Sequence, residues 1–204
     1  ARATQDSAER IGRWCDEQYV DAWYRRGGEL RVSTTPAHDD VGLASVRAAR
    51  ELGVAERLVD LTPAEVQAHC ASPVFRRGVF APDGATVHPA RLALGLRRRL
   101  AERGVAIHEH AHVREVRGEG PGSVLVRTAG ATVRARHAVL AAGGALARLG
   151  PLRGRVLVGS SHMIVTEPVP DVIEDLGWGD EAISDARSFL HYTRTTQDGR
   201  IAFG

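Results

Sequence analysis

The chain has 204 residues, of which 43% are hydrophobic and 25% are charged, and its formal net charge is +2. These proportions are typical of a globular protein, and the small net charge does not indicate nucleic acid or a membrane surface as a partner. All 27 basic residues other than histidine are arginines. Lysine and asparagine are absent. Both have AT-rich codons, so their absence indicates a GC-rich coding sequence and is not evidence of function.

The two cysteines and the hydrophobic runs bear on the compartment. Cys15 and Cys70 are far apart and do not form a C-x-x-C motif, so a disulfide framework is not expected. The longest apolar run, residues 138–147, falls short of the roughly 20 residues that span a bilayer. No basic-then-apolar leader opens the chain. We therefore expect a cytoplasmic protein without a membrane span.

The first hundred residues are predicted to be mainly helical. A first helix starts at Asp6 or Ser7 and continues through Trp23, where its aromatic residues either pack it onto the body or form a binding platform. A half-buried strand is expected at 29–35. Further helices are expected at 40–52, 63–70 and 89–103. Thr62, Pro63 and Glu65 form a capping box with proline at the first helical position.

Two arginine- or histidine-rich stretches invite functional readings. Residues 97–99 are three consecutive arginines in the last predicted helix. They suggest phosphate binding, but they point around the helix axis and fit a solvated face better. His108, His110 and His112 alternate in a predicted strand at 105–113 and would share one side of it. Histidine is a common metal ligand. No aspartate or cysteine follows at ligand spacing, however, so no metal site is predicted.

A short apolar run, residues 138–142, is predicted to be a buried parallel strand. It follows a strand at 114–117 and a hairpin at 123–136, and it ends at Gly143-Gly144. A helical spacing begins again at Leu146 and Leu149. This pattern fits either an ordinary strand-to-helix turn or a ligand contact at the carboxyl end of a strand, where open α/β sheets bind their ligands. The sequence contains no G-x-G-x-x-G motif.

After Pro151 the pattern becomes that of an antiparallel sheet. A long strand is expected at 155–167, and a short helix from Asp171 to Leu176. Strands at 182–187, 188–193 and 200–203 follow, the last two joined by a turn at 195–199.

Several of these features together resemble the FAD-dependent D-amino-acid, glycine and sarcosine oxidase family. They are the helix start Gly84-x-x-Val87-x-Pro89-x-x-Leu92, the segments Gly104-Val105-x-Ile107 and Val113-x-x-Val116, and the run 138–143. The later motifs resemble the branch of gamma-glutamylputrescine oxidoreductases. They are Thr166-Glu-Pro168, Asp185-x-Arg187, His191-Tyr-x-Arg194 and Asp198-Gly-Arg-Ile-x-x-Gly204. The resemblance extends from Glu9 to Gly204.

The resemblance implies a mixed α/β flavoprotein, in which a doubly wound FAD-binding domain is interleaved with an antiparallel-sheet substrate domain. Residues 1–84 would be helices and part of the substrate domain, 85–150 part of the FAD-binding domain, and 151–204 the substrate-domain sheet. The residues expected to contact FAD are Val113, Ala141, Ala142, Gly143 and Gly144. The expected substrate-site residues are Tyr192 and Arg194.

The sequence also departs from the family pattern. The glycine-rich pyrophosphate loop and the acidic residue that holds the ribose do not occur in it. We therefore expect an internal part of a longer enzyme that oxidises the C–N bond of an amine or amino acid. Two alternatives are a flavin dehydrogenase for hydroxy acids or polyol phosphates, and a non-catalytic domain without a cofactor. The expected partner is a small molecule, and a homo-oligomer is left open.

Overall fold

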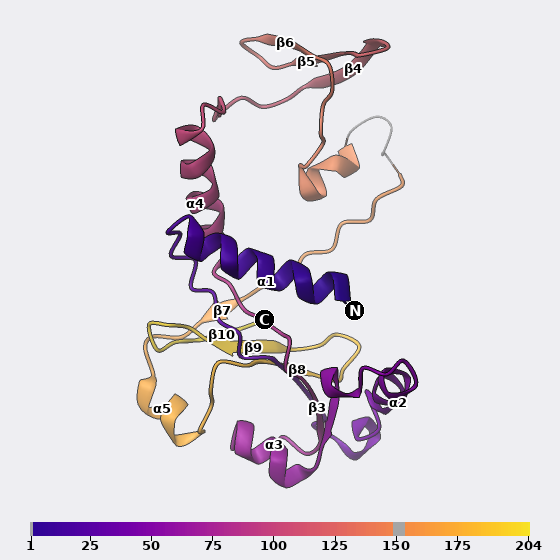
Figure 1. The fold of residues 1–204 in the computed structure, drawn as a ribbon, viewed down its shortest axis with the longest axis vertical. Coiled ribbons are helices and arrows are strands. Elements are labelled where there is room, and N and C mark those ends of the chain that lie inside the picture. The colour runs from indigo at the N-terminus through magenta and orange to yellow at the C-terminus, as the bar shows by residue number, and fades with distance from the viewer. Residues whose placement is uncertain (1, 149–153) are drawn as a thin grey trace. The chain divides into compact units, whose positions relative to one another are not determined.

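The computed structural model describes residues 2–148 and 154–204, which form two compact units (Figure 1). Unit 1 comprises Ala1–Glu102 and His162–Gly204, and unit 2 is Arg103–Ser161. The predicted domain boundary between residues 150 and 151 lies outside the described residues. The assignment of segments to an FAD-binding and a substrate domain therefore stays a prediction.

Unit 1 contains the α-helices and a seven-stranded mixed sheet, and unit 2 contains a three-stranded sheet. The described helices are α1 (Arg2–Glu17), α2 (Leu43–Glu51), α3 (Pro63–His69), α4 (Pro89–Glu102) and α5 (Pro170–Asp175), with 3-10 turns η1 (Pro36–His38), η2 (Ala55–Arg57) and η3 (Gly143–Arg148). The strands of unit 1 are β1 (Glu29–Val32), β2 (Val59–Leu61), β3 (Gly78–Ala81), β7 (Ile164–Val165), β8 (Ala182–Asp185), β9 (Tyr192–Thr195) and β10 (Ile201–Phe203). Unit 2 contributes β4 (Glu115–Gly120), β5 (Ser123–Arg127) and β6 (Thr132–Ala135).

The sheet of unit 1 has the strand order β2-β3-β1-β8-β9-β10-β7. Its pairs are antiparallel except for β1 and β8, which run parallel in the centre. One side of this sheet forms the main core, where Leu30, Val32 and Ile183 pack on Val66 of α3 and Ile173 of α5. Burial of each such aliphatic side chain contributes roughly 1.5–3 kcal/mol. In Figure 1, α3 and α5 lie on one side of the strands and α1 on the other.

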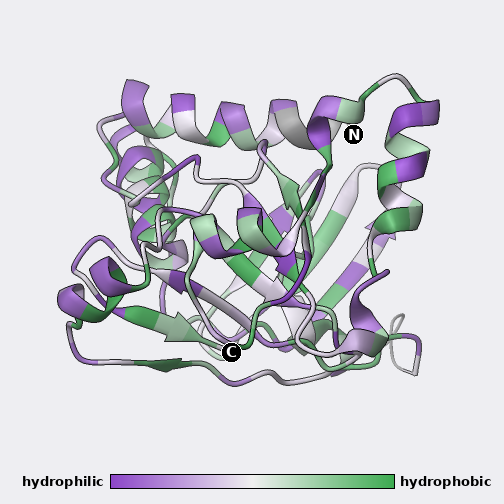
Figure 2. Ribbon diagram, turned by 90° about the horizontal axis from the view of Figure 1, so that it is seen from below, coloured by the Kyte–Doolittle hydropathy of each residue, from purple (hydrophilic) through white to green (hydrophobic). Residues whose placement is uncertain are grey.

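Local signals placed two helices correctly. At α3, Thr62 Oγ1 accepts from the Glu65 backbone N–H, and a Glu65 carboxylate oxygen accepts from the Thr62 backbone N–H at 2.7 Å, which confirms the capping box. The predicted helix at 89–103 is confirmed as α4. Gly95 lets α4 pack closely against Val20, since a Cβ at position 95 would lie 2.2 Å from Val20 Cγ1. Figure 2 shows helices banded by hydrophilic and hydrophobic residues, as amphipathic packing requires.

The first helix ends earlier than predicted. It stops at Glu17, and Tyr19 takes a left-handed conformation (φ 51°). The Val20 N–H donates to the Cys15 carbonyl at 2.8 Å, and the Tyr19 N–H donates to Asp16 at 3.1 Å. This is a Schellman ending, which usually has glycine at the position of Tyr19. The sequence carries no glycine there, so the apolar spacing through Trp23 suggested a longer helix.

Four predicted strands do not form as expected. Residues 105–113 and 138–142 are irregular, and of residues 155–167 only β7 is a strand. No described strand pairs with the first two segments, and His110 has a left-handed φ of 55°. A strand needs a hydrogen-bonding neighbour, and the apolar run is correspondingly exposed, Val139 to 90%. The strand predicted at 188–193 begins only at Tyr192 and is β9, because residues 188–191 are irregular. The predicted hairpin is confirmed as β5 and β6.

None of the described helices has the length and apolar character that a bilayer crossing requires. Within residues 2–148 and 154–204, no three histidine, cysteine or acidic side chains gather as metal ligands do.

Candidate functional site

The two predicted substrate residues lie together on β9 in unit 1. Ile183 lies opposite Thr193 across the β8–β9 pair, and Ile183 belongs to the core side of the sheet. Side chains alternate along a strand, so Tyr192 and Arg194 both lie on the opposite, more polar side. Tyr192 also pairs with Gly204 through two backbone hydrogen bonds of 2.8 and 2.9 Å. Its ring covers Gly204, where a Cβ would lie 2.5 Å from the ring.

Arg194 is a partly buried cation. Burial lowers the pKa of its guanidinium, and the neighbouring charge of Arg25 lowers this pKa further. Among the described residues, no carboxylate pairs with it and no group accepts a hydrogen bond from it. A desolvated cation without a partner is unfavourable, and an anionic group of a ligand would relieve that cost.

Arg194 borders a small hollow together with residues from two other parts of unit 1. The walls are Trp23, Arg25, Thr86, Arg194, Thr195, Thr196 and Gln197. The segment 22–25 is tied to 86–88 by backbone hydrogen bonds, from Arg25 to Thr86 at 3.0 Å, from Thr86 back to Arg25 at 2.8 Å, and from His88 to Ala22 at 2.8 Å. Sequence reasoning missed Trp23 and Arg25, because it read them as the end of a helix.

A second polar cluster lies at the β8–β9 loop. The Asp185 carboxylate is only 6% exposed and accepts from the Arg187 and His191 backbone N–H groups. Its other oxygen lies 3.0 Å from His191 Nδ1 and 3.2 Å from Arg187 Nε. Burial raises the pKa of Asp185, but the hydrogen bonds from His191 and Arg187 outweigh burial and hold it below the usual value. The cluster fixes both ends of the loop that leads into Tyr192.

The predicted cofactor residues lie in unit 2. Val113, Ala141 and Ala142 line one hollow of about 820 Å³, and Gly143 and Gly144 follow directly without lining it. The structure therefore brings these three residues together, although the strand that was expected to hold the alanines is not formed. Tyr192 and Arg194 belong to the other unit, so the structure does not relate them to this hollow.

The hollow in unit 2 suits part of an FAD molecule. Its volume falls within the range of known ligand pockets, and its walls include Val116 and Val126 beside the alanines. Arg114 lies at the same hollow, and its side chain makes no ion pair with a described residue. Apolar walls with a free guanidinium match an adenosine carrying phosphates. Gly143 (φ 51°) has no atom within 4 Å of where its Cβ would be, so the backbone there is open to a ligand.

Comparison with known proteins decides the family. The family model described as FAD dependent oxidoreductase matches residues 1–204. The chain belongs to this family of FAD-dependent oxidoreductases. The resemblance found in the sequence is thereby confirmed at the level of the family, and FAD is the cofactor on which that family depends. Membership of the gamma-glutamylputrescine branch stays a prediction.

Sequence relatives carry only a general name. The chain is 26% identical over 140 residues to the "Probable oxidoreductase OrdL" of Rhizobium meliloti and 27% identical over 146 residues to that of Haemophilus influenzae. Each match covers 69% of this chain, but only 32% and 34% of the relatives. The chain thus spans about a third of the length of these relatives.

Solved structures confirm the fold class. Glycine oxidase from Geobacillus kaustophilus has a TM-score of 0.77 at 21% identity, with 98% of this chain and 53% of that chain covered. L-Amino acid deaminase from Proteus myxofaciens has a TM-score of 0.72 at 20% identity, covering 98% and 45%. The mixed α/β fold is therefore that of the FAD-dependent oxidases, as the sequence predicted.

Proposed function

We propose that the protein oxidises the C–N bond of an amine or amino acid and passes the hydride to FAD. The proposal is supported by the family, by the amino-acid oxidases among its structural neighbours, and above all by one observation in unit 1. Arg194 is a partly buried cation without an anionic partner in the described residues, and it lies two residues from Tyr192 on the same side of β9. That pair can hold the two polar ends of an amino acid.

Each residue of the pair has a distinct part in this proposal. Arg194 binds the substrate carboxylate, and the Tyr192 hydroxyl orients the amine while its ring walls the site. An amine releases a hydride well only when it is neutral, and a nearby guanidinium disfavours its protonated form. Arg194 would thus also prepare the substrate. The carbon next to the nitrogen loses a hydride and the nitrogen loses a proton, and water hydrolyses the resulting imine.

The residues that would hold the cofactor are those of the unit 2 hollow. Val113, Ala141 and Ala142 would contact the adenosine part, Gly143 and Gly144 would allow close approach of the backbone, and Arg114 would pair with a phosphate. FAD, when bound, supplies the hydride acceptor.

We also propose a cytoplasmic location, a small-molecule substrate and a homo-oligomer. Both cysteines are free and buried, which is typical of a cytoplasmic protein. The substrate is a small molecule. Exposed apolar side chains such as Val139 and Leu157 in unit 2 favour self-association into a homo-oligomer.

Anaerobic reduction of the flavin tests the function. The purified protein is mixed with FAD and then with primary amines, amino acids or hydroxy acids, and loss of the visible flavin band is followed. We expect amino acids or amines to bleach the band and hydroxy acids to leave it unchanged. Bleaching by hydroxy acids alone would instead identify a hydroxy-acid dehydrogenase, and failure to take up FAD would contradict the proposal.

Variants on β9 test the proposed roles of Arg194 and Tyr192. Arg194→Gln removes a charge-assisted contact and should raise KM for amino acids about 10- to 100-fold. Tyr192→Phe should lower kcat. Thr193→Ala is the matched control, because Thr193 lies between them on the same strand, faces the other side of the sheet, and donates its hydroxyl to the Ala202 carbonyl.

A further inference from the structure

Gly204, directly after β10, lies opposite Tyr192 of β9. Each of the two donates its backbone N–H to the carbonyl of the other, at 2.9 Å from Tyr192 and 2.8 Å from Gly204. The neighbouring pair in the same register is Thr193 and Phe203. Since side chains alternate along a strand, Gly204 faces the same side of the sheet as Tyr192. A side chain at position 204 would therefore project toward the tyrosine ring.

The hydroxyl end of that ring occupies the space that such a side chain would need. A Cβ at position 204 would lie 2.5 Å from Cζ, 2.6 Å from Cε2 and 2.7 Å from the hydroxyl oxygen of Tyr192. All three distances are well below the ~3.5 Å at which carbon atoms come into contact. The place of the hydroxyl oxygen thus depends on the lack of a side chain at Gly204.

An alanine at position 204 would displace the ring rather than the backbone. The φ of Gly204 lies outside the left-handed region, so an alanine can adopt this backbone conformation without strain. Tyr192 is only partly buried, and rotation about its χ angles carries the end of the ring away at little cost. Raising the separation from 2.5 Å to ordinary contact moves the hydroxyl by roughly 1 Å.

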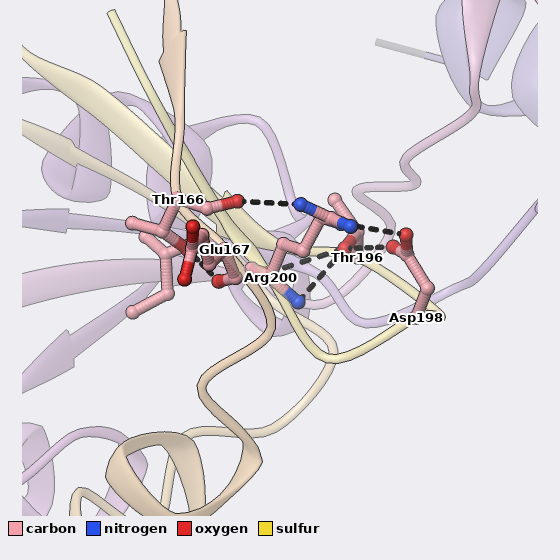
Figure 3. A network of polar contacts seen from close by, with 6 residues as sticks. Thr166, Glu167, Thr196, Asp198 and Arg200 are labelled. Carbon is pink, nitrogen blue, oxygen red and sulfur yellow. Dashed lines mark hydrogen bonds and ion pairs between the residues drawn. The ribbon is translucent and has the colours of Figure 1, made fainter.

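Polar contacts hold β10 between its two neighbours, so the strand that leads to this glycine is fixed. In the β9–β10 turn, Asp198 accepts from the Thr196 hydroxyl at 2.5 Å and from Arg200 Nε at 2.9 Å (Figure 3). Arg200 also donates to the Thr166 carbonyl at 2.9 Å, and the Ile201 backbone N–H donates to the Thr166 hydroxyl at 3.0 Å. These contacts join the start of β10 to the turn from β9 and to the end of β7.

A tyrosine ring over a glycine also stabilises a sheet without any part in a reaction. Cross-strand aromatic side chains compensate for glycines, which have no side chain to pack. That effect needs only the ring, so Tyr192→Phe would retain it. The part proposed for Tyr192 in orienting an amine needs the hydroxyl. The two roles therefore respond differently to loss of the hydroxyl and to displacement of the ring.

We propose that Gly204 is a positioning residue, which fixes the Tyr192 hydroxyl on the Arg194 side of the sheet by having no side chain. This role rests on the proposed function, because Gly204 acts only through the hydroxyl that orients the amine. A displacement of about 1 Å in a reacting geometry can lower a rate about 100-fold. Carboxylate binding by Arg194 does not involve the ring, so Gly204 affects kcat rather than KM.

Fluorine NMR tests the position of the hydroxyl without a cofactor. The chain has three tyrosines, and 3-fluorotyrosine places a fluorine next to each hydroxyl. The signal of Tyr192 is the one that Tyr192→Phe lacks. We expect Gly204→Ala to shift this signal, to leave the other two signals in place, and to keep the urea midpoint of the parent. The proposal fails if the signal does not move, or if the variant loses its cooperative urea transition.

A second glycine gives the matched control. Gly118 lies in strand β4 and also has a φ outside the left-handed region, but no atom lies within 4 Å of its Cβ position. Gly118→Ala should shift none of the three fluorine signals. A shift of the Tyr192 signal as large as that in Gly204→Ala would show that the signal does not report on contact with position 204.

Reduction of bound FAD by amino acids tests the effect on the reaction. Gly204→Ala should lower kcat about 10-fold, because the hydroxyl is misplaced rather than absent. It should leave KM within about twofold of the parent. In the Tyr192→Phe background, Gly204→Ala should lower kcat no further, because the hydroxyl through which Gly204 acts is already gone. An equal fall of kcat in both backgrounds would contradict the positioning role.

The results separate this role from the proposed function. If amino acids and amines do not reduce the flavin in the parent, the proposed function fails, whereas the fluorine signal still decides whether Gly204 fixes the ring. If the parent reduces its flavin and the signal moves in Gly204→Ala while kcat stays as in the parent, the proposed function stands and the positioning role fails.

Discussion

The residue with the clearest electrostatic role outside the site is Asp39. Its carboxylate accepts from Arg76 at 2.8 and 3.1 Å and from the Ser33 hydroxyl at 2.5 Å. The Arg76 hydrogen bond, followed by that of Ser33, lowers the pKa of Asp39 to about 2. This contact fastens the loop after β1 to the chain just before β3.

The pKa of Asp39 predicts a pH dependence of stability. The folded pKa is below the unfolded value of about 3.8, so the contribution is fully present above that value and is lost as the pH falls through about 2. We expect Asp39→Asn to lower the free energy of unfolding at pH 7, and the difference from the parent to shrink below pH 4. Urea denaturation of both proteins at several pH values measures this difference in the free energy of unfolding. A difference that stays constant down to pH 2 would contradict this assignment.

The loop before Tyr192 should depend on one buried carboxylate. Asp185→Ala leaves the Arg187 and His191 backbone N–H groups without their acceptor, and we expect a loss of about 2–3 kcal/mol in the free energy of unfolding. Asp198→Asn is the control, since Asp198 is a solvent-exposed aspartate that is also paired with an arginine. Chemical denaturation should show a much smaller loss for it. Equal losses would argue against a special role for Asp185.

At the scale of elements, the capping box of α3 offers a clean test. Thr62→Ala removes the hydroxyl that accepts from the Glu65 N–H, and the helix should lose about 1 kcal/mol. Thr35 precedes η1 in the equivalent position, but its side chain makes no capping hydrogen bond. Thr35→Ala should therefore change stability little, and calorimetry can compare the two. If both variants lose the same stability, the box contributes nothing.

How far the sequence predicted these elements depended on where their stabilising contacts lie. Helices α3 and α4 and the β5–β6 hairpin carry their caps and turns within a few residues, so the sequence located them. The expected strands at 105–113 and 138–142 needed a hydrogen-bonding partner elsewhere in the chain. The hydrophobic pattern of a segment does not show whether such a partner exists. Tyr19 ends α1 in a conformation for which glycine is the usual signal, so that end was missed.

The same distinction applies to the candidate site. Tyr192 and Arg194 share one side of β9 because alternation is a local property, and the sequence predicted this correctly. Trp23 and Arg25 reach the same hollow from the far end of the chain, and only the fold brings them there. In unit 2, Val113, Ala141 and Ala142 line one hollow, and their contact with FAD stays a prediction.

At the scale of the whole molecule, the two units bury different side chains in separate sheets, and this predicts separable stability. Leu125 is 2% exposed in the middle of β5, and Leu30 is fully buried in β1. Leu125→Ala should cost about 2–5 kcal/mol and speed amide hydrogen exchange in β4, β5 and β6. Leu30→Ala should do the same in the sheet of unit 1. Exchange that rises equally in both units for either variant would show a single cooperative body.

The central parallel pair has a consequence for synthesis on the ribosome. β1 cannot gain its neighbour β8 until the chain has been made beyond residue 185, whereas the strands of unit 2 pair with their immediate neighbours in sequence. Local pairs form faster than distant ones. We therefore expect unit 2 to fold first while the first half of unit 1 waits with one edge of β1 open. During that interval the nascent chain would present an unpaired edge that invites aggregation, and it is then that a chaperone would matter most.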